Sequence, residues 1–168
     1  MKQAKPIKRF AKAARAFCGW ATSGPAEATG QAIAAAQLVA DLLAAGCALG
    51  AEEGEPAIGE VHPDELKRVT ETAAALPFQY YSEVFSNLVV PPEEPVVGDI
   101  VDDMEDIYRD VSIGLVLFDQ GRKGKAAKHW RFWFVHHWGE HATSALRALW
   151  SYVADRRRCD GPEWPRDA

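Results

Sequence analysis

The sequence predicts an all-α protein, a compact single-domain bundle of about five to seven helices with an acidic, Pro-rich connector. Three observations predict this class. Apolar residues recur at steps of three and four along much of the chain. The 168 residues, 48% hydrophobic and 26% charged, suit one packed domain. Six Trp, seven Phe and four Tyr supply large side chains for its core. We assign residues 1–156 to the helical domain and residues 157–168 to a short polar tail.

The first half of the chain predicts three helices. Residues 5–20 carry one apolar stripe opposite Lys and Arg side chains, and residues 26–49 form an Ala-rich helix that should pack closely. After an acidic loop, a third helix begins at His62-Pro63 and stops near Ala75, because Pro77 follows. Residues 78–90 fit either a short helix or an extended segment. They end at a stiff, exposed connector that contains Pro91, Pro92 and Pro95.

The second half has the clearest helical pattern. Asp99 is the expected N-cap of a helix that runs to about Asp119. Its apolar stripe consists of Ile100, Met104, Ile107, Tyr108, Val111, Leu115 and Phe118. Residues 121–124 form a tight turn, so the next helix should pack antiparallel. That helix is expected from Lys125 to about Arg156, with a kink or break at Gly139.

Charge is distributed unevenly along the chain, whose net charge is −5. Residues 51–110 hold sixteen acidic and three basic side chains, whereas basic residues exceed acidic ones on either side. This pattern argues against a nucleic-acid surface, since the acidic segment would repel phosphate. It is compatible with a basic protein partner or a self-complementary homodimer.

The compartment expected from the sequence is the cytoplasm. The three cysteines, Cys18, Cys47 and Cys159, are widely spaced and form no Cys-x-x-Cys pair, which suits a reducing environment. Lys and Arg interrupt the N-terminal stretch where a secretory signal would need an apolar core. The uninterrupted apolar runs are shorter than the ~20 residues of a membrane span, so we expect no membrane association.

Two histidines are the clearest candidates for chemistry. On a continuous helix His137 and His141 are four residues apart, so both imidazoles point the same way, which is a spacing that presents two nitrogens to a metal. Zinc or iron needs at least a third ligand, and the carboxylates of the helix after Asp99 are the natural donors. Two histidines on an apolar face are more often neutral core groups, each hydrogen-bonded to a carboxylate or a backbone carbonyl.

Carboxylates of the preceding helix complete the candidate site. Asp99, Asp102 and Asp103 are explained by their place in the first helical turn, where the helix dipole favours anions. Asp106 and Asp110 extend an apolar side of the helix and need a partner if they are buried. A metal would be held by His137, His141, Asp106 and Asp110; without a metal, we expect a buried polar cluster of Asp106, Asp110, Arg131, His137, His141 and Arg147.

Two functions of different classes remain open, and no catalytic residue is assigned. The preferred hypothesis is a non-enzymatic protein-interaction module that needs no cofactor. The alternative is a metal-binding or hydrolytic helical protein with a divalent ion at His137/His141 and Asp106/Asp110.

Several short segments resemble a known bacterial family. The segments are Asp106-Ile-Tyr-Arg-Asp110, Gly114-Leu115, Gly121, Trp130-Arg131, His137-Trp138-Gly139-x-His141-Ala142 and Ala145-Leu-Arg-Ala-Leu149. Together they resemble the family known as domain of unknown function 5063, most strongly over residues 99–150. The resemblance implies an all-helical cytoplasmic bacterial protein and carries no activity. It also implies a histidine where this chain has Trp150, so a three-histidine site would be incomplete here.

Overall fold

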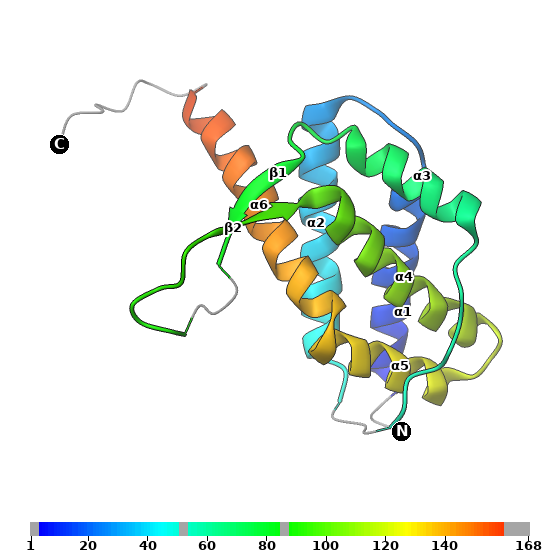
Figure 1. The fold of residues 1–168 in the computed structure, drawn as a ribbon. Coiled ribbons are helices and arrows are strands. Elements are labelled where there is room, and N and C mark those ends of the chain that lie inside the picture. Colours follow the sequence, from blue (N-terminus) through cyan, green and yellow to red (C-terminus); the bar gives the residue numbers. More distant parts are fainter. Residues whose placement is uncertain (1–3, 51–53, 85–87, 160–168) are drawn as a thin grey trace.

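The computed structural model describes residues 4–50, 54–84 and 88–159, which form six helices and one two-stranded sheet (Figure 1). In chain order the elements are α1 (Ala4–Ala21), α2 (Ala28–Cys47), α3 (Pro63–Ala74), β1 (Tyr80–Glu83), β2 (Val96–Asp99), α4 (Ile100–Asp119), α5 (Lys123–His136) and α6 (Trp138–Cys159). The protein is therefore an all-α bundle, as predicted. The Pro-rich connector is exposed from residue 88 to residue 97.

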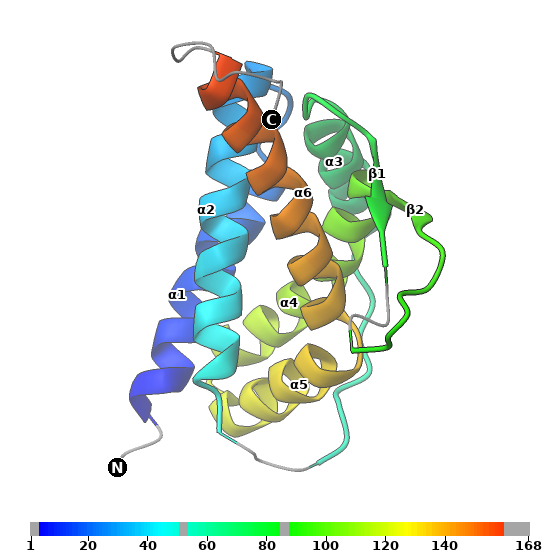
Figure 2. The ribbon, with the colours of Figure 1, turned by 90° about the vertical axis from the view of Figure 1, so that its left-hand side faces the viewer.

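Helices α4 and α6 occupy the middle of the bundle. Helix α2 packs against α1 and α6, while α4 packs against α1, α3, α5 and α6. Figure 2 shows α1 and α2 on one side and α3 on the other, with the β1–β2 hairpin beside α6. This arrangement places one long face of α4 directly against α6.

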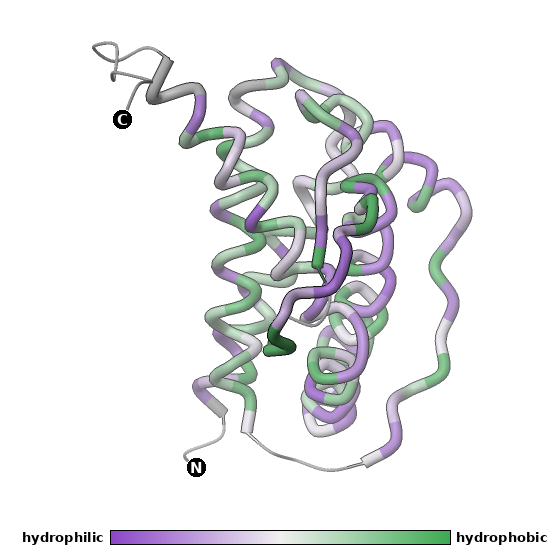
Figure 3. Tube along the Cα trace, turned by 60° about the vertical axis from the view of Figure 1, so that its left-hand side comes forward, coloured by the Kyte–Doolittle hydropathy of each residue, from purple (hydrophilic) through white to green (hydrophobic). Residues whose placement is uncertain are grey.

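All six helices contribute to the core, and its largest side chains meet where α1 contacts the α5–α6 corner. The Phe10 ring contacts the rings of Trp130 and Trp138, with centroid distances of 4.6 Å and 5.6 Å, and all three side chains are fully buried. Hydrophobic and hydrophilic residues alternate along most helices, as amphipathic packing requires (Figure 3). Trp130 and Trp138 are thus core residues.

Helix α2 contains a segment, Gly30–Cys47, that is long and apolar enough to cross a membrane by length and composition. In the fold this helix is packed between α1 and α6. Its buried side chains are Gln31, Ala32, Ala35, Val39, Leu42 and Ala45. The apolar side chains on the buried face of α2 therefore form part of the core of the bundle.

The segment that fitted either a helix or an extended piece contains a strand. Residues Tyr80–Glu83 form β1, which pairs antiparallel with β2, and Tyr81 lies opposite Gly98. The strand is short, and its inward-facing residues are Tyr81 and Glu83. Both of these side chains reach the region between α4 and α6.

The predicted helix that begins near Lys125 is divided at its middle, but not at Gly139. The break lies at His137, whose φ and ψ of −155° and −85° are not helical. Only glycine fits at position 139, because the first turn of α6 packs closely against the last turn of α5. A Cβ at Gly139 would lie 2.1 Å from the carbonyl oxygen of Phe134. Helix α6 continues to Cys159, past the predicted end of the domain, and residues 160–168 lie outside the described part.

Candidate metal centre

Three carboxylates form a row along the face of α4 that meets α6. Asp99 caps the helix, its side chain accepting a hydrogen bond from the Val101 backbone N–H at 2.9 Å. Asp103, Asp106 and Asp110 follow at spacings of three and four residues, which places them on one side of the helix. Asp103 and Asp110 are buried, and Asp106 is half-buried. A row of buried carboxylates requires compensating partners.

The partners are the two histidines of the α5–α6 corner. His137 is the residue between the helices, and its backbone N–H bonds the carbonyl oxygen of Trp133 at 2.9 Å. His141 lies in the first turns of α6. The two imidazoles therefore converge across a helix break, and not along one continuous helix as expected; their ring centroids are 4.9 Å apart.

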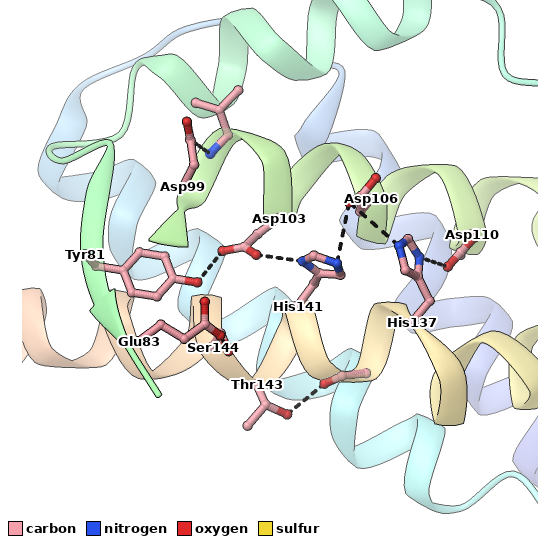
Figure 4. A network of polar contacts seen from close by, with 12 residues as sticks. Tyr81, Glu83, Asp99, Asp103, Asp106, Asp110, His137, His141, Thr143 and Ser144 are labelled. Atoms are coloured by element: carbon pink, nitrogen blue, oxygen red, sulfur yellow. Dashed lines mark hydrogen bonds and ion pairs between the residues drawn. The ribbon is translucent and has the colours of Figure 1, made fainter. Parts of the chain in front are cut away.

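Each imidazole is held by its own carboxylate. Nδ1 of His137 lies 2.8 Å from Oδ2 of Asp110, and Nδ1 of His141 lies 2.9 Å from Oδ1 of Asp103 (Figure 4). An ionised carboxylate only accepts hydrogen bonds, so the proton belongs on Nδ1 in both rings. In the neutral rings Nε2 is then left with a free lone pair. This is how carboxylates commonly orient metal-binding histidines.

Both Nε2 atoms face the same oxygen of Asp106. Oδ2 of Asp106 lies 3.5 Å from Nε2 of His141 and 3.8 Å from Nε2 of His137. These separations exceed the usual length of an N–H···O hydrogen bond. Two ligands bound to one zinc ion at about 2.1 Å lie about 3.4 Å apart in tetrahedral geometry. The one potential ligand atom of each residue lies within 4.8 Å of the others, so the three residues can hold one ion.

The other oxygen of Asp106 is fixed by Arg109. The guanidinium donates to Oδ1 of Asp106 at 2.6 Å and to Oε2 of Glu105 at 2.9 Å. One carboxylate oxygen is thus bound by a cation of the protein, and the other is turned toward the histidines. This geometry suits a carboxylate that binds an ion through a single oxygen.

The hairpin adds a further layer around His141. The Tyr81 hydroxyl donates to Oδ2 of Asp103 at 2.7 Å, and the Ser144 hydroxyl donates to Oε1 of Glu83 (Figure 4). Asp103 therefore accepts from both Tyr81 and His141. These contacts fix the position of Asp103 and, through it, the orientation of the His141 ring.

Burial and hydrogen bonding together raise the pKa of four groups in this network. Burial raises the pKa of Asp103 and of Asp110, although the hydrogen bonds from His141 and His137 oppose that rise. The hydrogen bond to Asp103 raises the pKa of His141, against the effect of burial. Burial likewise raises the pKa of the Tyr81 hydroxyl, which stays protonated. All these groups hold protons more tightly than in an unfolded chain, and at Nε2 of His141 that proton competes with a metal ion.

The pKa of His141 predicts a pH-dependent contribution to the stability of the metal-free protein. A raised folded-state pKa stabilises the fold below the unfolded-state pKa of about 6.5, and this contribution is lost as pH rises through the folded value. We therefore expect the advantage of the wild type over His141→Asn in free energy of unfolding to be larger at pH 6 than at pH 9. Burial lowers the pKa of His129, which acts in the opposite sense but is common to both proteins.

Urea unfolding in the presence of a chelator measures this difference at both pH values. A difference that does not change with pH would show that His141 gains no proton affinity on folding.

The structure brings together most of the predicted site, with changed roles. Asp106, His137 and His141 converge as predicted, whereas Asp110 holds His137 and does not face the shared centre. Arg131 is placed elsewhere, with its guanidinium 5.7 Å from the centroid of the Phe134 ring. Arg147 lies farther along α6 and makes no hydrogen bond or ion pair with the residues that the structure describes.

Sequence reasoning missed two members of the network and one contact of a third. Asp103 is explained by its place in the first helical turn, yet it is the partner of His141. Tyr81 gives no signal of its own. The i,i+4 spacing predicts the pair of Arg109 with Glu105, which is formed, but not the contact of Arg109 with Asp106. Trp150, where the resemblance implies a histidine, is 61% exposed. The third potential ligand beside the two histidines is Asp106.

Comparison with known proteins identifies the family. The structure is similar to the crystal structure of protein BF1032 from Bacteroides fragilis, with a TM-score of 0.70 and 17% sequence identity, covering 89% of this chain and 95% of that chain. At this identity the likeness shows the fold alone. No curated protein matches the sequence. The family model of a domain of unknown function, DUF5063, matches residues 2–155. The chain therefore belongs to the DUF5063 family.

Proposed function

We propose that this protein binds one divalent transition-metal ion through His137, His141 and Asp106, and that the ion activates water for hydrolysis. One observation carries the proposal: two histidines, each fixed at Nδ1 by its own carboxylate, direct Nε2 toward one oxygen of a third carboxylate. Two imidazoles and one carboxylate are a ligand set of zinc, iron and manganese proteins.

The distances favour a shared ion over simple ion pairs. A protonated histidine that paired with Asp106 would form a charge-assisted hydrogen bond of about 2.8 Å. The separations of 3.5 Å and 3.8 Å leave this contact unmade on both rings, while the Nδ1 contacts at 2.8 Å and 2.9 Å are fully formed. Each imidazole is therefore held firmly at Nδ1 by its own carboxylate, whereas its Nε2 is only loosely paired with Asp106.

The proposed centre is reachable from solvent. The side chains of His137 and His141 are 37% and 28% exposed, whereas that of Asp106 is 15% exposed. Three protein ligands leave at least one coordination position for water. A bound ion of this kind lowers the pKa of its water toward neutrality and polarises the oxygen of a substrate, which is the basis of metal-assisted hydrolysis.

Metal titration of tag-free protein tests the binding step. After chelator treatment, the wild type should take up one Zn²⁺ or Co²⁺ per chain, with Co²⁺ absorption reporting the coordination. His137→Ala/His141→Ala should lose this binding. The matched control is His62→Ala/His136→Ala, which removes two exposed histidines outside the centre. Absence of stoichiometric binding in the wild type, or an equal loss in both variants, would contradict the proposal.

Hydrolysis is tested separately with nitrophenyl esters and phosphates. We expect turnover by zinc-loaded protein that disappears on chelation and in the His137→Ala/His141→Ala variant. Metal binding without turnover of any of these substrates would leave the binding function standing and reject hydrolysis of these substrate classes.

A second candidate is a protein-interaction module, favoured by the exposed connector. Leu88 and Val90 are 98% and 89% exposed, and Glu93 and Glu94 follow after two prolines. Exposed apolar side chains beside acidic ones suit a partner with an apolar patch flanked by basic residues, or a second copy of the chain. The free thiols of Cys18 and Cys47 suit a reducing compartment, which supports a cytoplasmic location in a bacterium.

Sedimentation at several protein and salt concentrations tests the homodimer. A dimer held by this connector should dissociate in Leu88→Ser/Val90→Ser, and raised salt should weaken its charged contacts. A wild type that stays monomeric at every concentration would exclude self-association.

A further inference from the structure

A cavity between the hairpin and α6 lies next to the proposed centre. It has a volume of about 540 Å³, which falls within the range of small-molecule sites. Phe78 and residues 80–84 form one wall, and residues of α6 between Thr143 and Tyr152 form the other. The two walls run in opposite directions, since Glu83 bonds Ser144 at one end and Phe78 contacts Tyr152 at the other.

The two ends of this cavity differ chemically. At one end, the rings of Phe78 and Tyr152 are 5.9 Å apart and form an aromatic wall. The opposite end is polar and close to the metal centre, because Ser144 lies one turn after His141 and the Tyr81 hydroxyl bonds Asp103. A ligand that fills the cavity is therefore elongated, with an apolar end and a polar end.

Arg147 lies between the two ends, and its positive charge favours an anionic ligand. It lines the cavity and makes no ion pair with any residue in the described part of the chain. The carboxylate of Glu83, also in the lining, already accepts the hydrogen bond of Ser144. The free cation in the wall is thus a planar guanidinium, which binds a carboxylate through two parallel hydrogen bonds.

We propose that this cavity binds a small aromatic carboxylate, with the carboxylate on Arg147 and the ring against Phe78 and Tyr152. An anionic group at the polar end would be repelled by Glu83, so Arg147 determines where the charge lies. This site is separate from the proposed metal centre. It requires no ion, and it would stand if the metal proposal failed.

Binding of 3-phenylpropionate, followed by NMR, tests the site. We expect shifts at residues of the cavity and at least tenfold weaker binding of the neutral amide, 3-phenylpropionamide. Arg147→Gln should weaken binding of the acid by about tenfold to a hundredfold, the usual range for a lost charge-assisted pair. Arg147→Lys should be intermediate, since it keeps the charge and loses the paired hydrogen bonds.

Arg131→Gln is the matched control, because Arg131 stacks near Phe134 outside the cavity; it should bind as the wild type does. The His137→Ala/His141→Ala variant should also retain binding, which separates this proposal from the metal centre. Equal binding of acid and amide, no effect of Arg147→Gln, tighter binding of the cation 3-phenylpropylamine, or no binding of the acid would each overturn the proposal.

Discussion

Replacing Asp106, His137 or His141 individually by Ala is expected to weaken Zn²⁺ binding by about a thousandfold or more, because each change removes one of the three ligands proposed for the ion. Replacing Asp103 or Asp110 by Asn should have a smaller effect. Those residues orient the imidazoles, and loss of such an outer partner typically costs about tenfold to a hundredfold in metal affinity. The ranking of the variants, measured by competition with a chromophoric chelator, therefore reports the role of each side chain.

Thermal unfolding gives a second measure of the same prediction. An ion that binds only the folded state stabilises it by about 4 kcal/mol when its concentration is a thousand times Kd. Zinc should therefore raise the Tm of the wild type. It should also raise the Tm of Asp110→Asn, but only at a higher zinc concentration. It should leave the Tm of His141→Ala unchanged.

A purely structural role of the histidines makes a different prediction. In that case each substitution lowers the stability of the metal-free protein, because a buried carboxylate loses its partner, and added zinc has no specific effect on any variant. Arg109→Gln is informative here. It frees Oδ1 of Asp106 without touching a histidine, so it should weaken metal binding only modestly while it lowers stability.

The helices of the second half could be predicted because their signals are local. The predicted Asp99 cap and the apolar stripe to Asp119 match α4, since a cap and a 3.6-residue period depend on neighbouring residues alone. The strand β1 could not be separated from a short helix. It is four residues long and depends on pairing with β2, whose partner residues lie 13 to 19 positions later in the chain.

The candidate site shows the same limit. The sequence predicts that Asp106, His137 and His141 belong together, because helical spacing places them on faces that a bundle can oppose. It could not predict that Asp103 is buried, since that follows from the packing of α4 on α6. Nor could it predict that Asp106 faces both histidines whereas Asp110 holds His137. This difference depends on the helix break at His137.

Gly114→Ala is expected to destabilise the protein by about 3 kcal/mol, although alanine is the better helix former by about 1 kcal/mol. A Cβ at Gly114 would lie 2.1 Å from Nε1 of Trp130, a ring that is fully buried between helices. The ring has to move, and its N–H then loses the bond to the carbonyl oxygen of Val111 at 2.9 Å. Overpacking costs about 1–3 kcal/mol and a buried donor without a partner a similar amount, so together they exceed the gain in helix propensity.

Gly19→Ala is the matched control, since Gly19 is an exposed helical glycine with no atom within 4 Å of the added Cβ. That change should stabilise the protein by up to about 1 kcal/mol, so the same substitution has opposite signs at the two sites. Urea unfolding measures both variants, and equal effects would show that Trp130 does not pack on α4 as described.

The effect of Gly114→Ala should extend to the proposed metal centre. Trp130 and His129 bond the consecutive carbonyl oxygens of Val111 and Asp110, so displacing Trp130 should shift α5 relative to α4 beside Asp110, the residue that holds His137. The folded Gly114→Ala protein should therefore also bind zinc more weakly, whereas Gly19→Ala should bind it as the wild type does.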